Sequence, residues 1–103
     1  MEKSLDKKFY FNDEIFKQEL DNIFHSDWIC CGREEDMDSV GSYKIFEIGN
    51  ENFFIIKDKN NEIRVFHNFC KHRGCQILGD EKSSPLKRNI RCPYHSWVYN
   101  FDG

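Results

Sequence analysis

Apolar residues recur with two different periods along the chain, and the first of these predicts a helix near the N-terminus. Four apolar residues follow the i, i+4, i+7, i+8 spacing of one helical face: Phe16, Leu20, Ile23 and Phe24. Asn12 or Asp13 can cap such a helix, so we expect it to span residues 13–25 and to end at His25. Residues 1–11 are a charged lead, which we expect to be a surface arm.

After the helix, short runs of β-branched and aromatic residues alternate with turn residues, which is the pattern of strands. We expect strands over five segments: residues 27–32, 42–48, 53–57, 62–67 and 97–99. Turn residues occupy positions 49–52 and 58–61, and the charged segment 79–85 is expected to be a solvent-facing loop. The pattern predicts a mainly β fold, an antiparallel sandwich or partial barrel preceded by one N-terminal helix. This divides the chain into residues 1–26, arm and helix, and residues 27–103.

The composition limits the broad class of protein. The chain has 103 residues, enough for one small domain, and its formal net charge of −3 comes without any basic run, so binding to nucleic acid has no support. The first residues lack the apolar segment of a signal peptide, and the longest apolar run, residues 53–56, is too short to span a bilayer. We therefore expect a soluble, cytoplasmic protein with no membrane partner. The aromatic residues, 16% of the chain and ten of them Phe, are expected to build the core and shield the functional site.

Two short segments each offer one cysteine and one histidine, as Cys70-x-His72 and Cys92-x-x-His95. Thiolates and imidazoles bind zinc, and they also bind iron–sulfur clusters. A structural zinc finger usually takes two cysteines from one segment and two histidines from another. Mixed segments can instead give two cysteines to one iron and two histidines to its neighbour, which is the ligand division of a Rieske [2Fe–2S] centre. A structural zinc site, or no metal at all, remains the alternative at this point.

The residues around these pairs resemble a known family. The stretches C-K-H-R-G at 70–74 and C-P-Y-H-S-W at 92–97 resemble the Rieske domain of ring-hydroxylating oxygenase large subunits, which are Rieske non-haem iron oxygenases. The resemblance continues upstream through residues 23–24 with Trp28, and through residues 32–33, 41–43 and 64–68. One departure is Ser96, where family members usually carry glycine, a residue that tolerates positive φ better than serine does.

The resemblance implies a role for each residue of the two segments. Cys70 and Cys92 would hold the inner iron of a [2Fe–2S] cluster, and His72 and His95 the outer iron. Six neighbours would support them: Arg73 by orienting a neighbouring domain or subunit, Gly74 and Pro93 by shaping the loops, Tyr94 or Ser96 by a hydroxyl hydrogen bond, and Trp97 by packing as a lid. Respiratory-type Rieske proteins carry a disulfide cysteine at the position of Cys75, but its partner position holds a tyrosine here. We therefore expect reduced thiols.

The resemblance also implies a function. Residues 27–103 would be a Rieske domain, incomplete at its C-terminus, that receives an electron from a reductase or ferredoxin. It would pass the electron to a mononuclear non-haem iron in a catalytic domain or neighbouring subunit of an oxygenase, and the resemblance also implies a trimer. That second iron belongs to a domain absent from this chain, so the fragment alone is predicted not to turn over substrate. A free-standing Rieske ferredoxin and a structural zinc domain are the alternatives.

Overall fold

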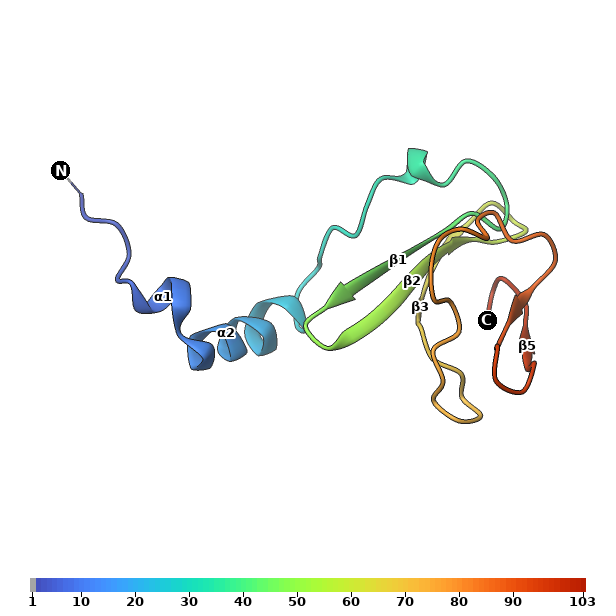
Figure 1. The fold of residues 1–103 in the computed structure, drawn as a ribbon. Coiled ribbons are helices and arrows are strands. Elements are labelled where there is room, and N and C mark those ends of the chain that lie inside the picture. Colours follow the sequence, from blue (N-terminus) through green and yellow to red (C-terminus); the bar gives the residue numbers. More distant parts are fainter. Residues whose placement is uncertain (1) are drawn as a thin grey trace. The chain divides into compact units, whose positions relative to one another are not determined.

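The computed structural model describes residues 2–103 (Figure 1). The chain divides into two compact units, with the boundary in the sequence between Cys30 and Cys31. Each unit is described by itself. Met1, part of the expected N-terminal arm, lies outside the described residues. The division expected from the sequence, after residue 26, falls four residues earlier than this boundary.

The first unit is helical. It contains α1 (Lys8–Phe11), α2 (Asp13–Glu19) and a π-helical turn, η1 (Leu20–Phe24), that continues α2. The expected helix is thus confirmed, with Asn12 Oδ1 accepting a hydrogen bond from the Ile15 N–H and His25 as the closing residue. Helix α1 was not expected, because four residues of a charged arm carry no periodic signal. No helix among residues 2–103 is long and apolar enough to cross a bilayer.

The second unit is built on a three-stranded antiparallel sheet. Its strands are β1 (Tyr43–Ile48), β2 (Glu51–Lys57) and β3 (Ile63–His67), and they lie in that order (Figure 1). A second sheet has two short antiparallel strands, β4 (Ile90–Arg91) and β5 (Val98–Tyr99). The strands expected at 42–48, 53–57, 62–67 and 97–99 are confirmed, with shifts of one or two residues at their ends. The mainly β fold is confirmed with them.

A loop covers the free edge of β1. Three of its groups accept hydrogen bonds from the strand: Ser84 Oγ from the Tyr43 N–H (3.1 Å), Glu81 Oε1 from the Ile45 N–H (2.8 Å) and Asp80 O from the Tyr43 hydroxyl (2.7 Å). Segment 79–85 is therefore more than the solvent-facing loop expected from its charges, although most of it is exposed. Its side chains satisfy strand N–H groups that would otherwise be left unpaired at the sheet edge.

The strand expected over residues 27–32 is wrong. This segment has no regular structure, Trp28 is 98% exposed, and a short 3-10 turn, η2 (Glu34–Asp36), follows it. A strand needs a partner for its backbone groups, and no strand among residues 2–103 pairs with this segment. Alternating apolar residues alone do not show whether such a partner is present.

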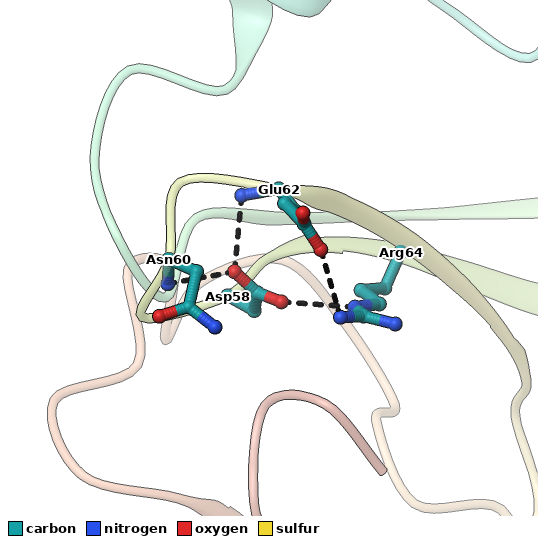
Figure 2. A network of polar contacts seen from close by, with 4 residues as sticks. All are labelled: Asp58, Asn60, Glu62 and Arg64. Carbon is teal, nitrogen blue, oxygen red and sulfur yellow. Dashed lines mark hydrogen bonds and ion pairs between the residues drawn. The ribbon is translucent and has the colours of Figure 1, made fainter.

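A buried carboxylate fixes the turn between β2 and β3 (Figure 2). Asp58 is 1% exposed and accepts hydrogen bonds from the N–H groups of Asn60 (2.8 Å) and Glu62 (3.0 Å). Its other oxygen pairs with Arg64 Nε at 2.9 Å, and Arg64 also contacts the Glu62 carboxylate. The Arg64 guanidinium, followed by the Glu62 N–H, holds the pKa of Asp58 below its ordinary range. The turn predicted around residues 58–61 is therefore confirmed, and the ion pair between Asp58 and Arg64 stabilises it.

The core lies between one face of the large sheet and the segments that follow β3. Tyr43, Phe54 and Ile56 form the sheet side of this core, and Ile90 and Phe101 are among the residues packed on it. The two cysteines of the predicted site, Cys70 and Cys92, belong to the same buried cluster. The expectation that the aromatic residues build the core holds only in part, because Tyr43, Phe54 and Phe101 are buried and the other aromatic side chains are partly or fully exposed.

The two segments that carry the predicted ligands have the same backbone turn. We call residues 70–75 loop 1 and residues 92–97 loop 2. In each loop the first residue's N–H donates to the sixth residue's carbonyl (2.7 and 2.8 Å), and the fifth residue's N–H donates to the first residue's carbonyl (2.7 and 3.0 Å). The fifth residues, Gly74 and Ser96, both have positive φ, 67° and 60°. Ser96 therefore keeps the conformation for which the family uses glycine.

We expect substitutions at the two fifth positions to have opposite effects on stability. Gly74→Ala puts a side chain at φ 67° and should lower the free energy of unfolding by about 1–2 kcal/mol. Ser96→Gly removes the same strain, offset in part by a more flexible unfolded chain, and should raise that free energy by about 0.5 kcal/mol.

Urea unfolding of the unaltered chain, Gly74→Ala and Ser96→Gly measures these differences in the free energy of unfolding. Gly79→Ala is the matched control, because a Cβ at Gly79 has open space and its φ is not in the left-handed region. A Gly74→Ala variant as stable as Gly79→Ala would contradict the strained turn.

Candidate metal centre

The structure brings the four predicted ligands together as two pairs with different surroundings. Cys70 and Cys92 are each 2% exposed and lie in the hydrophobic core. His72 and His95 are exposed, and their Nδ1 atoms are 3.3 Å apart. The donor set is therefore divided into buried sulfur atoms and solvent-facing imidazoles.

The surroundings of Cys70 favour its thiolate form. The Tyr99 hydroxyl lies 3.1 Å from Cys70 Sγ. This hydrogen bond is the main cause that lowers the pKa of Cys70, and the N–H groups of His72 and Arg73 lower it further. Burial of the thiol acts in the opposite direction. The same contact raises the pKa of Tyr99, because its proton is held by the sulfur. A thiolate is the form that binds metal, so this environment prepares Cys70 as a ligand.

Tyr99 is a residue of the site that the sequence analysis missed. A hydroxyl hydrogen bond was expected from Tyr94 or Ser96, and the hydroxyl that lies 3.1 Å from Cys70 Sγ is that of Tyr99. Tyr99 pairs with Ile90 across the small sheet, and Ile90 is buried. Paired residues of an antiparallel sheet point to the same face, so the burial of Ile90 could have indicated that Tyr99 points inward.

Two aromatic side chains contact the imidazoles. The indole of Trp97 is stacked on the His72 ring, with centroids 4.5 Å apart and planes inclined by 4°. The Tyr94 ring lies against His95 at a centroid distance of 4.0 Å. Each imidazole is therefore held from one side by a ring that belongs to loop 2. Trp97 itself is 46% exposed, so the stack lies at the surface rather than in the core.

The other residues predicted to support the site occupy the rim of the two loops. Arg73 and Pro93 are exposed, and Arg73 contributes its N–H to the surroundings of Cys70. Gly74 and Ser96 hold the positive-φ positions described above. All six supporting residues therefore lie in the same two loops as the four candidate ligands.

The remaining histidines and Cys75 are placed differently. His67 lies on the outer face of the large sheet, where its ring packs against those of Phe53 (4.7 Å) and Phe69 (5.5 Å). His25 ends the helical unit. Burial, followed by the neighbouring thiols of Cys92 and Cys70, raises the pKa of Cys75. Among residues 2–103, no group of three or more His, Cys, Asp or Glu side chains has the arrangement of a site for one metal ion.

Comparisons with known proteins agree with this geometry. The model of the Rieske [2Fe-2S] domain family matches residues 27–103. The chain is 32% identical over 97% of its length to the glycine betaine monooxygenase oxygenase subunit of Pseudomonas aeruginosa, covering 23% of that protein. It is 35% identical over 94% of its length to the carnitine monooxygenase oxygenase subunit of Acinetobacter baumannii, covering 26% of it.

A solved structure is also similar. The quaternary ammonium Rieske monooxygenase CntA, in complex with its substrate gamma-butyrobetaine, has a TM-score of 0.88 and 33% identity, over 97% of this chain and 28% of that one. The chain thus spans about a quarter of the length of the relatives it matches. With a family match over three quarters of its length, the chain belongs to the Rieske [2Fe-2S] domain family and is homologous to the N-terminal part of Rieske oxygenase α subunits.

Proposed function

We propose that loops 1 and 2 hold a Rieske [2Fe–2S] cluster, through which this chain receives an electron for a Rieske non-haem iron oxygenase. The observation that carries the proposal is the division of the four donors into two buried sulfurs and two exposed Nδ1 atoms 3.3 Å apart. Cys70 and Cys92 would hold the inner iron, and His72 and His95 the outer one. When bound, such a cluster supplies a one-electron redox centre.

The residues of the chain fit this group chemically. The contacts of Cys70 favour its thiolate, and two imidazoles whose Nδ1 atoms face each other can both be ligands if each carries its proton on Nε2. Two thiolates and two neutral imidazoles balance the charge of two ferric ions and two sulfides. An electron is added more easily to a neutral centre than to the doubly negative centre that four thiolates give, which favours a high reduction potential.

The exposed histidines mark the side on which an electron partner would approach. Residues 63–101 contain seven Lys and Arg but two Asp and Glu, although the whole chain carries −3. Among the described residues, only Arg64 of these seven forms an ion pair with a carboxylate. Unpaired positive charge beside the histidines, on Lys71 and Arg73, fits a reductase or ferredoxin with an acidic surface, because opposite potentials speed association.

The chemistry on substrate would belong to the rest of an oxygenase. Relatives of this chain are named as oxygenase subunits for glycine betaine and carnitine, and the likeness to them extends over the N-terminal helices as well as the cluster loops. This extent favours an oxygenase over a free-standing Rieske ferredoxin. We infer O2-dependent hydroxylation or demethylation at a mononuclear non-haem iron in a catalytic domain or neighbouring subunit of a trimeric assembly.

Metal analysis and electron paramagnetic resonance of the purified chain test the proposal. We expect two irons and two acid-labile sulfides per chain, and a signal that appears on reduction by one electron, because the [2Fe–2S] cluster then has an unpaired spin. Without another subunit, the reduced chain should consume no O2 in a reaction that depends on substrate. A colourless protein with one zinc ion would contradict the proposal and support the structural zinc alternative.

We expect Tyr99→Phe to lower the reduction potential of the loaded chain. The Tyr99 hydroxyl stabilises negative charge on Cys70 Sγ, and that charge increases on reduction. A loss of about 1 kcal/mol corresponds to roughly 40 mV for one electron, so a decrease of a few tens of millivolts is expected in a potentiometric titration.

Tyr94→Phe is the matched control, since it keeps the ring that contacts His95 and removes only a hydroxyl. If Tyr94→Phe lowered the potential while Tyr99→Phe left it unchanged, the hydrogen bond to Cys70 would not be the one that sets the potential.

A further inference from the structure

The imidazole of His72 is held from outside the loop that carries it. The ring is exposed, and among residues 2–103 its two ring contacts are both with loop 2, to Trp97 and His95. Its ring hydrogen bond is also with loop 2, between its Nδ1 atom and that of His95 at 3.3 Å. No hydrogen bond or ring contact within loop 1 therefore fixes the direction in which this imidazole points.

The Trp97 indole lies flat on the His72 ring. Their centroids are 4.5 Å apart and their planes are inclined by only 4°, which is the arrangement of a stacked aromatic pair. Rotation of the imidazole about its Cβ–Cγ bond would tilt it out of this stack. The His95 ring is inclined by 53° to the His72 ring and is not stacked on it. Trp97 is therefore the contact that sets the plane of His72.

Trp97 is itself tied to the small sheet. Its carbonyl accepts a hydrogen bond from the Cys92 N–H at 2.8 Å, and the next residue, Val98, begins β5 and pairs with Arg91 of β4. The indole is thus presented to loop 1 by a backbone that is fixed on both sides. A residue held in this way can orient a neighbour that has no restraint of its own.

The two imidazoles are held in different ways. Tyr94 contacts His95 at a centroid distance of 4.0 Å and directly precedes it in loop 2, so this pair lies within one loop. The stack of Trp97 on His72 instead joins loop 2 to loop 1. Loss of the indole would therefore release His72 and leave the ring contact of His95 in place.

We propose that Trp97 is a positioning residue, which orients His72 as a cluster ligand by stacking on it across the two loops. The proposal rests on the proposed function, since His72 is one of the four candidate ligands. A side chain whose plane is already fixed loses less freedom when it binds, and such pre-organisation strengthens binding. Trp97 would thus act on the cluster through His72, rather than by covering the cluster as a lid.

Nuclear magnetic resonance of the reduced, cluster-free chain tests the contact without any variant. We expect nuclear Overhauser effects between the indole protons of Trp97 and the carbon-bound ring protons of His72. The ring current of the indole should also shift these His72 protons upfield, because they lie over its face. Absence of the Overhauser effects would overturn the proposal.

Two variants assign the shift to its source. In Trp97→Leu the largest change in chemical shift should fall on the His72 ring protons, whereas in the matched control, Tyr94→Leu, it should fall on those of His95. His72 ring protons with the same shifts in Trp97→Leu as in the unaltered chain would contradict the stack.

Release of iron from the loaded chain to a chelator measures the effect on the site. It should be about ten-fold faster in Trp97→Leu, because residues that orient a metal ligand typically contribute at least this much to metal binding. Trp97→Phe keeps a ring for the stack and should release iron at nearly the unaltered rate. Trp28→Leu, which removes the exposed tryptophan of the helical unit, should leave the rate unchanged. Equal rates in Trp97→Leu and the unaltered chain, or no rescue by Trp97→Phe, would overturn the proposal.

The two proposals can fail separately. If the reduced, unaltered chain took up no iron and sulfide, the proposed function would fail whatever the Overhauser effects showed. If that chain loaded normally but Trp97→Leu released its iron no faster, only the inference about Trp97 would fail.

Discussion

The rest of this site depends on one constraint, the burial of two cysteine sulfurs in the hydrophobic core of the second unit. Cys70 and Cys92 pack with residues of the large sheet and of the small one, so the segments that fill the core also fix the distance between the two loops. Loss of that packing would separate the sulfurs. The imidazoles, by contrast, have no place in the core and face solvent. One arrangement thus gives a sheltered side and an accessible side.

The two loops have the same backbone turn but different spacings between cysteine and histidine. One carries its histidine two residues after its cysteine and the other three residues after it, yet both close with the same hydrogen bonds and the same positive-φ residue. The backbone turn is therefore the repeated unit, and the histidine position varies within it. This explains why serine can stand at the fifth position of loop 2: the hydrogen bonds of the turn, together with the ring contacts of Tyr94 and Trp97, hold a conformation that serine alone disfavours.

Local patterns in the sequence predicted the N-terminal helix, most of the strands and all four candidate ligands, because each depends on residues close together in the chain. Features that depend on distant segments were not predicted. The segment 27–32 forms no strand, since no strand among the described residues pairs with it. Tyr99 reaches Cys70 because β5 pairs with β4, which turns its side chain toward the core. Spacing within a motif shows which atoms can bind a metal, but it does not show which neighbours complete the site.

The charge of the site follows from its donors. Because two of the four donors are imidazoles, the oxidised centre would be neutral, and the expectation of a high reduction potential follows from that count. Pulsed electron paramagnetic resonance of the reduced, loaded chain, prepared with 15N-labelled histidine, counts the nitrogen ligands directly. The account predicts hyperfine couplings from two histidine nitrogens, one of which is lost when His95 is replaced by cysteine. A reduced cluster without nitrogen coupling would contradict it.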